Sequence, residues 1–437
     1  MPNERANRPI RPERALTRRR LLQSSAGAVA GPLLVKEGVI GRHGKPGAND
    51  TIRLAYIGTG GRGMDHVEPG AAAVCDVDDG HIADALKKTG GNPFVTKDFR
   101  RILDRSDVDA VMIATPDHWH AVMTVMACQA GKDVYCEKPT AKTIEEGQAM
   151  IAAARKYGRI VQIGAQGRSQ RYSHAACEYV RNGQIGQVSR VEVWHPTNWT
   201  DGWGKEEPAP SSLDWEMWLG PARSLPYNAA YCFFNFRWMM EFGAGFIRDR
   251  GNHVLSIVSW LMNVDRTGPV SVEATGMPSP DGVWDVPVTM NVTWKFENPA
   301  WTLTWGQPGD PKSFPGSTDK IEWGARYYGD KGELTVSGGD SSGTTEQKAF
   351  DYAPPPDGIH IPESLDHRQN WLDSIKTRKL PIMDVAIGHR VVTMPIIANI
   401  SYRLGRPLRW DPAHEHFIGD GEANRLLSMP YRAPWRI

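Results

Sequence analysis

Gly58, Gly60 and Gly63 stand in the spacing G-x-G-x-x-G directly after the short apolar run at residues 52–57. Residues without a side chain here allow a tight turn, a close approach of the backbone to a pyrophosphate, and packing of a helix against the strand. Asp76 ends the next apolar run, where its carboxylate can accept hydrogen bonds from ribose hydroxyls and would repel a 2′-phosphate. The pattern predicts a dinucleotide site that favours NAD over NADP; the alternative is a glycine-rich turn with a solvated aspartate.

Further polar side chains follow the later apolar runs. His118 and His120 come just after residues 110–114, near the carboxyl end of a predicted parallel strand, where ligands of open α/β sheets bind. His120 could equally well cap the helix that follows. Gln166 and Arg168 come after the last strand of this series and could reach into a cleft between two domains, although a polar pair without a catalytic role fits as well.

Tryptophan is frequent, with sixteen residues in the chain. Flat indole faces can stack on the C–H faces of a pyranose ring, so Trp199, Trp203 and Trp238 are candidates for a carbohydrate pocket. In Trp301-Thr-Leu-Thr-Trp305 the apolar side chains alternate with threonines, which predicts one apolar face of a strand. That face indicates core or a subunit interface, and we expect homo-oligomers to form through it.

The elements that must carry these residues change in type along the chain. From residue 52 to about 165, short apolar runs alternate with helical segments, which predicts a parallel, doubly wound sheet. The first helix has to be short, because Pro69-Gly70 ends it. Beyond about residue 166, strand-like runs follow one another with turn signals between them. The strands expected there are 188–194, 270–275, 286–296, 301–305, 321–328 and 333–336.

The predicted fold class is α/β, with an N-terminal Rossmann domain and a C-terminal α+β domain that has an open, largely antiparallel sheet. The expected organisation is residues 1–49 as signal and linker, 50–165 as the dinucleotide-binding domain, 166–380 as the sheet domain for substrate and oligomerisation, and 381–437 as a terminal helix and tail packing back on the body.

The composition narrows the function classes. Lys and Arg number 51 against 50 Asp and Glu, so no polyanion such as nucleic acid is indicated as a partner. The five cysteines contain no C-x-x-C pair and are odd in number, which predicts mostly buried thiols and neither a zinc site nor a disulfide framework. No metal site is predicted.

The N-terminus has the pattern of a targeting segment. Arg18-Arg19 precede a mildly apolar stretch broken by Pro32, which is too short and too weakly apolar to span a membrane. An arginine pair in this position indicates a twin-arginine signal, with a plausible cleavage site at Ala28-Val-Ala30, and hence export to the periplasm or beyond. The alternative is a disordered basic tail.

From residue 52 to the C-terminus the sequence resembles the Gfo/Idh/MocA oxidoreductases, a family named for glucose-fructose oxidoreductase and inositol dehydrogenase. The leader and the ending around Trp410 and Tyr431 resemble a secreted bacterial branch. The markers of the resemblance are the glycine turn, Ala114-Thr-Pro-Asp-His-Trp-His120, Glu137-Lys138-Pro139, and Gly245-x-x-x-Asp249-x-Gly251-x-His253.

The resemblance implies roles for individual residues. The cofactor contacts expected are Gly58, Gly60, Gly61, Arg62, Gly63, Asp76, Thr115, Pro116, His120, Glu137, Lys138 and Gln166. The substrate contacts expected are His118, Lys138, Arg168, Trp199, Trp238, Asp249 and His253.

The resemblance makes Lys138 the catalytic lysine, and Asp249 and His253 the acid and base. Asp249 and His253 are four residues apart, so on one helix face they would meet, and the carboxylate would orient the imidazole. Without the resemblance, Lys138 reads as a surface lysine fixed before a proline, and Asp249 as a helix N-cap. Lys138 could also serve as the base itself.

These residues predict an NAD-dependent oxidoreductase acting on a secondary alcohol of a sugar, polyol or glycoside. A second hypothesis is a redox-neutral glycoside hydrolase or lyase that works through a transient keto-sugar with permanently bound NAD. A third is a sugar or dinucleotide sensor without catalysis.

Overall fold

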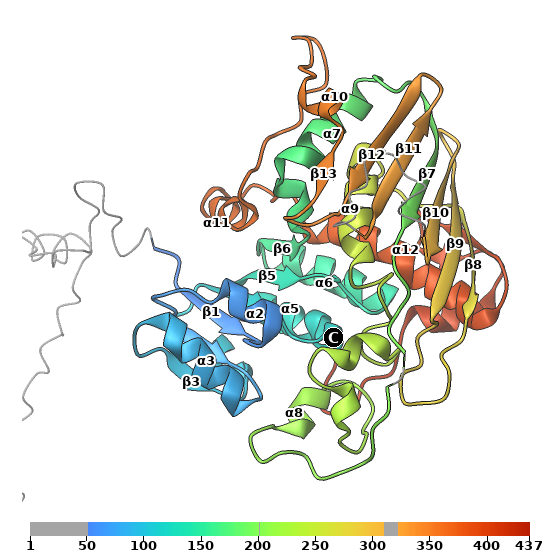
Figure 1. Cartoon of the computed structure of the whole chain (residues 1–437). Coiled ribbons are helices and arrows are strands. Elements are labelled where there is room, and N and C mark those ends of the chain that lie inside the picture. Colours follow the sequence, from blue (N-terminus) through green and yellow to red (C-terminus); the bar gives the residue numbers. More distant parts are fainter. Residues whose placement is uncertain (1–50, 201, 310–321) are drawn as a thin grey trace, which may run out of the picture. The chain divides into compact units, whose positions relative to one another are not determined.

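The apolar runs between residues 54 and 164 form a fully parallel, six-stranded sheet (Figure 1). The order β3-β2-β1-β4-β5-β6 reverses direction at the first strand, and the carboxyl ends at such a reversal are where doubly wound sheets bind ligands. The Rossmann arrangement predicted from the sequence is confirmed. The strands are β1 (Leu54–Ile57), β2 (Ala73–Cys75), β3 (Phe94–Thr96), β4 (Ala110–Ile113), β5 (Asp133–Glu137) and β6 (Val161–Gly164).

Helices connect these strands and bury them on both faces, as parallel sheets require. The first helix has only six residues and ends before Pro69, as expected. The last begins with a capping box, in which Thr143 accepts from the Glu146 amide and Glu146 accepts from the Thr143 amide. The helices are α2 (Gly61–His66), α3 (Asp79–Thr89), α4 (Arg100–Leu103), α5 (His120–Gln129) and α6 (Ile144–Lys156).

A second sheet of nine strands follows, with the order β13-β12-β11-β7-β10-β9-β8-β14-β15. All its neighbours are antiparallel except β7 and β10, so the prediction of a largely antiparallel sheet is confirmed. The strands are β7 (Val188–Trp194), β8 (Ser271–Met277), β9 (Thr289–Phe296), β10 (Trp301–Gln307), β11 (Gly324–Gly329), β12 (Gly332–Ser337), β13 (Thr344–Thr345), β14 (Leu408–Asp411) and β15 (His416–Phe417).

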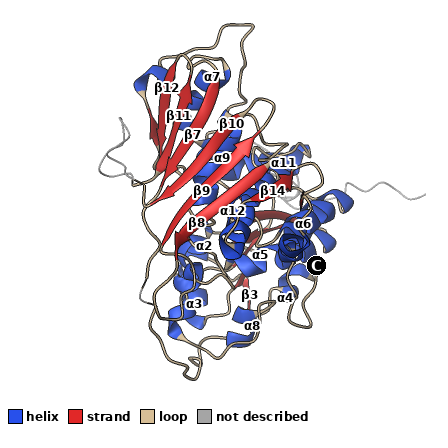
Figure 2. Ribbon diagram, turned by 90° about the vertical axis from the view of Figure 1, so that its right-hand side faces the viewer, coloured by secondary structure: helices blue, strands red, loops and turns tan. Residues whose placement is uncertain are grey.

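Helices cover one face of the nine-stranded sheet (Figure 2). These are α7 (Arg171–Arg181), α9 (Gly251–Leu261) and α12 (Val385–Leu404). Trp301, Leu303 and Trp305 point into this covered side and are at most 4% exposed. The prediction that this row is an exposed subunit interface is therefore wrong, because the chain's own helices bury it. The opposite face carries Thr302 and Thr304 between the same apolar positions.

Several short elements were not predicted, and neither were two sets that belong to the second sheet and its helical cover. Helix α7 lies where only strands were expected; its buried side is made of small or part-polar residues such as Ser173, Ala176 and Cys177, which give a weak apolar pattern in the sequence. Strands β14 and β15 lie in the C-terminal segment that was predicted as a helix and tail, and β14 pairs with β8 at the sheet edge. The remaining helices are α8 (Trp215–Leu219), α10 (Gln347–Phe350), α11 (His367–Thr377) and α13 (Gly421–Asn424), with short 3-10 turns at η3 (Asp117–Trp119), η4 (Gln166–Ser169), η5 (Ala229–Tyr231), η6 (Asn235–Trp238) and η8 (Arg425–Leu427).

The structure is a computed structural model that describes residues 51–200, 202–309 and 322–437. The predicted signal around Arg18-Arg19, with its Ala28-Val-Ala30 site, lies outside the described residues. Residues 52–437 form one compact unit. All five cysteines are free and buried, as predicted. In the described ranges no helix is both long and apolar enough to cross a bilayer.

Candidate active site

A cleft of about 480 Å³ opens at the carboxyl ends of β1, β2, β4 and β5. Its walls come from the Rossmann domain, which is the first part of the compact unit, and from the chain that follows it, which is the second part. The first part contributes Gly58, Gly60, Gly61, Arg62, Asp76, His81, Thr115, Pro116, Glu137 and Lys138, and the second contributes Met217, Trp218, Phe233, Phe234, Phe236, Arg237 and Asp249.

The glycine turn forms the floor of the cleft near β1. Gly58 has φ +80°, and a Cβ there would lie 2.8 Å from the Ala114 carbonyl carbon. A Cβ on Gly60 would lie 2.5 Å from the imidazole of His81, and one on Gly63 would lie 1.9 Å from the Gly58 carbonyl oxygen. Side chains are therefore excluded at all three positions, which leaves the backbone open to a pyrophosphate as the motif requires. Gly63 supports this turn from behind and does not line the cleft.

Asp76 is held rigidly at the edge of the cleft. Its Oδ2 accepts from the Thr59 amide at 2.6 Å, and its Oδ1 accepts from the Asp78 amide at 3.0 Å and from His81 Nδ1 at 3.3 Å. This hydrogen bond raises the pKa of His81 from its usual value. Both carboxylate oxygens keep acceptor capacity, so the arrangement fits the ribose hydroxyls of NAD.

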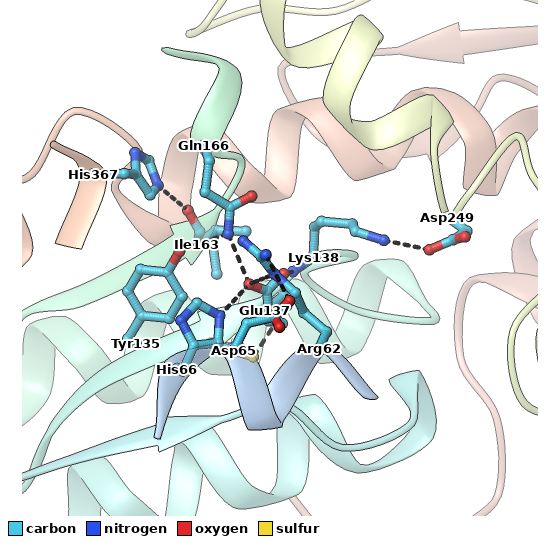
Figure 3. A network of polar contacts seen from close by, with 11 residues as sticks. Arg62, Asp65, His66, Tyr135, Glu137, Lys138, Ile163, Gln166, Asp249 and His367 are labelled. Atoms are coloured by element: carbon cyan, nitrogen blue, oxygen red, sulfur yellow. Dashed lines mark hydrogen bonds and ion pairs between the residues drawn. The ribbon is translucent and has the colours of Figure 1, made fainter. Parts of the chain in front are cut away.

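Glu137 lines the cleft and is the centre of a hydrogen-bond network (Figure 3). Its Oε1 accepts from His66 Nε2 at 2.7 Å, Gln166 Nε2 at 2.7 Å and Arg62 Nε at 3.2 Å. Burial by itself would raise the pKa of Glu137, but the His66 hydrogen bond and the nearby positive charges hold that pKa far below its usual range. Gln166 acts here through Glu137 and does not line the cleft, contrary to its predicted cofactor contact.

Lys138 and Asp249 meet across the cleft. Lys138 Nζ forms an ion pair with Asp249 Oδ1, and Arg237 Nε donates to Asp249 Oδ2 at 3.0 Å (Figure 3 shows the first pair). Burial would raise the pKa of Asp249, but the charges of Lys138 and Arg237 outweigh it and hold the pKa well below its usual range. A charged lysine is thereby fixed where the β5 end faces the second part of the unit.

Asp249 and His253 do not form the predicted pair. Helix α9 begins at Gly251 with Arg250 at its N-cap position, so Asp249 lies before the helix, and the i, i+4 geometry does not apply. Asp249 is not the N-cap either. His253 Nδ1 has no hydrogen-bond partner. Burial and the charge of Lys138 lower the pKa of His253 to about 4, so its imidazole is neutral at neutral pH.

Five predicted substrate contacts do not line the cleft: His118, Arg168, Trp199, Trp238 and His253. His118 Nε2 donates to the Trp218 carbonyl at 2.9 Å in the interior. Arg168 is buried in an ion pair with Asp265. Trp238 is fully buried, whereas Trp199 beside it is 52% exposed but not part of the cleft wall. His118, Arg168 and Trp238 satisfy polar groups or fill the core, which the sequence alone could not distinguish from ligand binding.

His120 is buried beneath the cleft wall. Its Nε2 and Nδ1 lie 2.9 Å from the Thr115 carbonyl oxygen and 2.7 Å from the Pro139 carbonyl oxygen. Trp119, not His120, holds the N-cap position of α5, and the imidazole caps nothing. Thr115 and Pro116 line the cleft as predicted, and His120 holds their loop from behind.

Sequence reasoning missed the segment that contains Phe233, Phe234 and Arg237. The Phe233 ring lies 4.5 Å from the His81 ring, and the Arg237 guanidinium lies 4.2 Å above the Phe234 ring. The signal was present as Phe-Phe-Asn-Phe-Arg-Trp, an unusual density of aromatic residues in a loop region. His81 was missed because a single histidine in a helix gives no pattern.

The same long loop region contacts the first domain beside Asp76. The Asp214 amide donates to the Val77 carbonyl at 2.9 Å, and Leu213 forms a β-bridge with Asp78. Lys97 Nζ donates to the Ser212 carbonyl at 2.8 Å. This contact closes the cleft on the side expected to hold the ribose. In the ranges that the structure describes, no group of three or more His, Cys, Asp or Glu is placed to hold a metal ion.

Two family models match the chain. One, described as the oxidoreductase family NAD-binding Rossmann fold, matches residues 52–165, and the other, described as the oxidoreductase family C-terminal alpha/beta domain, matches residues 178–312 and 358–437. The chain belongs to the Gfo/Idh/MocA oxidoreductase family. Its first domain is an NAD-binding Rossmann domain.

Curated relatives of this Gfo/Idh/MocA protein include sugar and polyol enzymes. The levoglucosan dehydrogenase of Pseudarthrobacter phenanthrenivorans is 34% identical over 105 residues, covering 24% of this chain and 27% of that protein. The inositol 2-dehydrogenase of Salmonella typhimurium is 32% identical over 154 residues, covering 33% and 46%. A glycosyl hydrolase family 109 protein of Shewanella putrefaciens is 31% identical over 159 residues, covering 33% and 35%. Each match spans less than half of the relative.

Solved structures resemble the chain over most of its length. An aldose-aldose oxidoreductase from Caulobacter crescentus, complexed with glycerol, matches with a TM-score of 0.59 and 22% identity, covering 82% of this chain and 99% of that one. A levoglucosan dehydrogenase in complex with NADH and L-sorbose matches with a TM-score of 0.58 and 19% identity, covering 82% and 98%. At these identities the likeness shows the fold.

Proposed function

We propose that this protein is an NAD-dependent dehydrogenase that oxidises a secondary alcohol of a sugar, polyol or glycoside. The observation that carries the proposal is the meeting of Lys138 and Asp249 on the wall of the cleft that also contains the glycine turn and Asp76. The proposed cofactor site and the Lys138–Asp249 pair thus share one cavity, whereas His253 does not line it. The sugar and polyol dehydrogenases among the relatives support this substrate class.

The chain's own residues bind the alcohol and remove its proton. Lys138 Nζ donates a hydrogen bond to the alcohol oxygen and stabilises the negative charge that develops there. Asp249 and Arg237 hold Lys138 in place. The neutral imidazole of His253 takes the hydroxyl proton. Bound NAD supplies the acceptor for the hydride that leaves the alcohol carbon.

The identity of the base has one alternative. A pKa of about 4 makes His253 a weak base, whereas the uncharged form of Lys138 would be a strong one. Lys138 Nζ is engaged with Asp249, so we assign the base role to His253 first.

A substrate panel tests the dehydrogenase proposal. The purified full chain is incubated with added NAD and a panel of sugars, polyols and glycosides, and NADH formation is followed by absorbance. We expect steady NADH formation with at least one secondary alcohol and a matching keto product by mass spectrometry. Binding of NAD and sugar without any product would contradict the proposal and favour the sensor.

A redox-neutral glycoside hydrolase or lyase is the second candidate. Relatives named as glycosyl hydrolase family 109 proteins favour it. Oxidation of a ring hydroxyl to a ketone, with bound NAD as hydride acceptor, would acidify the neighbouring C–H, so that this proton and the glycosidic oxygen could leave and form a double bond. A hydrolase would then add water across that double bond, whereas a lyase would keep it, and return of the hydride with a proton would restore the alcohol. Release of an aryl aglycone by desalted protein, without added NAD and without net NADH, would identify this activity.

Export is a separate proposal, supported by the arginine pair and the mild apolar stretch after it. Replacing Arg18 and Arg19 by lysine should retain the protein in the cytoplasm, since the pair is read as an address. Fractionation of cells that carry the native and the Lys-Lys variants measures this. Equal export of both would reject the signal.

We also propose that the protein forms homo-oligomers through its nine-stranded sheet. The Trp301 row cannot serve as the contact, so the candidate surface is the helix-free face that carries Thr302 and Thr304. Light scattering should give a mass above that of one chain, and Thr304→Arg should lower it. A monomer mass at all tested concentrations would contradict this.

A further inference from the structure

His120 has a backbone carbonyl oxygen against each of its two ring nitrogens. Nδ1 lies 2.7 Å from the Pro139 carbonyl oxygen, and Nε2 lies 2.9 Å from the Thr115 carbonyl oxygen. The side chain is 1% exposed, so water cannot replace either partner. Both distances are those of ordinary hydrogen bonds.

The chemistry of the partners determines the number of protons. A carbonyl oxygen can only accept a hydrogen bond, and a neutral imidazole has one N–H and one bare lone pair. In either neutral tautomer one ring nitrogen would therefore direct its lone pair at a carbonyl oxygen less than 3 Å away, inside the protein. Only the doubly protonated ring satisfies both contacts.

We infer that His120 is a permanently protonated imidazolium that ties the cofactor loop to the loop carrying Lys138, and so acts as a positioning residue of the proposed active site. This role rests on the proposed function, although the protonation state does not. Thr115 lines the cleft, and Pro139 directly follows Lys138. Two charge-assisted hydrogen bonds thus fix the spacing of the two loops.

The groups around His120 are consistent with a cation. Burial by itself lowers the pKa of His120, but Cys136 on β5, Asp117 in η3 and the Pro139 carbonyl outweigh it and raise the pKa to about 10. Arg248 faces Asp117 on its other side, with 3.7 Å between Nε and Oδ2. Burial raises the pKa of Asp117, and the charges of Arg248 and His120 act against that rise. The buried aspartate lies between two positive groups.

His118 provides a natural contrast two residues earlier. Its Nε2 donates to one carbonyl, that of Trp218, while its Nδ1 has no partner, and burial lowers its pKa to about 3. His367 also needs only one ring proton. Its Nε2 donates to the Ile163 carbonyl oxygen, while its Nδ1 can accept from the Ser169 hydroxyl. Among the histidines in the described ranges, His120 alone has a backbone carbonyl oxygen within hydrogen-bond distance of each ring nitrogen.

Nitrogen NMR of the full chain tests the protonation directly. Protein labelled with ¹⁵N-histidine is recorded between about pH 6 and about pH 9, the range in which an ordinary histidine loses its charge. The His120 resonances, assigned by their loss in His120→Gln, should show two protonated nitrogens throughout, while His118 in the same spectrum shows a neutral ring. A neutral His120 tautomer anywhere in this range would overturn the inference.

Kinetics test the positioning role. The neutral amide of His120→Gln has a single nitrogen and cannot replace both ring N–H groups. The hydrogen bonds to the Thr115 and Pro139 carbonyl oxygens are then no longer both made, so Lys138 loses its fixed place. We expect kcat to fall by roughly tenfold or more while the KM for substrate changes by less than about threefold, since misplacement acts mainly on the transition state. His174→Gln, on α7 with one carbonyl partner, is the matched control and should retain kcat.

A kcat within twofold of native in folded, NAD-loaded His120→Gln would reject the positioning role. If the variant does not fold, the native spectrum still decides without that assignment, because a ring with two protonated nitrogens at about pH 9 is expected and its absence would overturn the inference. If the native protein turns over no substrate, the proposed function fails, yet the NMR result stands by itself.

Discussion

At the scale of single residues, the site consists of charges that are buried with their partners. Asp249 is held between Lys138 and Arg237, and Glu137 is held by His66, Gln166 and Arg62. Removing one partner of such a pair leaves an uncompensated charge, which costs more than the pair contributes. Lys138→Ala still leaves Asp249 paired with Arg237, and His253→Ala removes no ion-pair partner, so these two substitutions isolate no carboxylate.

The proposed catalytic roles predict a large loss of turnover. His253→Ala and Lys138→Ala should each lower kcat by roughly two or more orders of magnitude, the usual scale for proton transfer. NAD binding should survive both changes, because neither residue belongs to the glycine turn. Steady-state kinetics with the best substrate and fluorescence titration of NADH measure the two effects. Near-normal turnover in NAD-loaded His253→Ala would transfer the base role to Lys138.

Asp76 should control the choice of cofactor. The native protein should bind NADH at least about tenfold more tightly than NADPH, because the fixed carboxylate accepts from ribose hydroxyls and repels a 2′-phosphate. Asp76→Ser should reduce the preference for NADH, so that the affinities for NADH and NADPH become more similar. Asp84→Asn, on the exposed side of the neighbouring helix α3, is the control and should leave it unchanged. Equal affinity of the native protein for both cofactors would refute the assignment.

At the scale of elements, close helix packing positions the Rossmann sheet against the second domain. Helix α6 approaches α12 at Gly147, where a Cβ would lie 2.0 Å from Nδ1 of His389. His389 in turn contacts Glu415 through Nε2 at 2.7 Å. The missing side chain at Gly147 thus decides how closely α6 and α12, two helices far apart in the sequence, can pack.

Gly147→Ala should therefore destabilise the protein although alanine favours helices. The gain in helix propensity is about 1 kcal/mol, whereas overpacking a buried contact costs about 1 to 3 kcal/mol. We expect a lower urea midpoint than that of the native protein. Gly421→Ala, whose Cβ meets nothing within 4 Å, should change the free energy of unfolding by less than about 0.5 kcal/mol. A midpoint that rises in Gly147→Ala would show that the helices separate freely.

At the scale of the whole molecule, buried histidines titrate in opposite directions. The pKa values of His118, His195, His253 and His367 are lowered to between about 3 and about 4, and that of His120 is raised to about 10. Burial lowers the first four. Cys136, Asp117 and the Pro139 carbonyl outweigh burial at His120.

These shifts predict a stability maximum near pH 6.5. Below that pH the unfolded chain binds protons that the four neutral histidines cannot bind in the fold, so the free energy of unfolding falls as the pH drops toward about 4. Above it, folded His120 keeps a proton that the unfolded chain releases, so its contribution falls by about 1.4 kcal/mol per pH unit until about pH 10.

Urea unfolding across this range measures the effect. The difference between the native protein and His120→Gln isolates the alkaline arm, because all other buried groups are common to both. We expect the native protein to lose stability relative to the variant between about pH 7 and about pH 8.5. Parallel curves in that window would contradict a raised pKa for His120.

The sequence by itself determined the Rossmann domain, the cofactor turn and the type of the second sheet. These features are local: apolar runs set the strands, and Gly58, Gly60 and Gly63 meet the demands of a turn made by neighbouring residues. The place of Asp76 was predictable as well, because β2 is the next strand along the chain, pairs with β1 and ends directly before Asp76. Lys138 followed from a motif specific enough to be recognised.

Only the tertiary structure decided which side chains face the cleft. Whether Asp249 turns to His253 or to Lys138 depends on where helix α9 begins and on a strand more than a hundred residues away. Arg168 and Trp238 have the same residue types as ligand-binding side chains, yet long-range packing buries them. Burial and pairing are set by contacts distant in sequence, which no local pattern records.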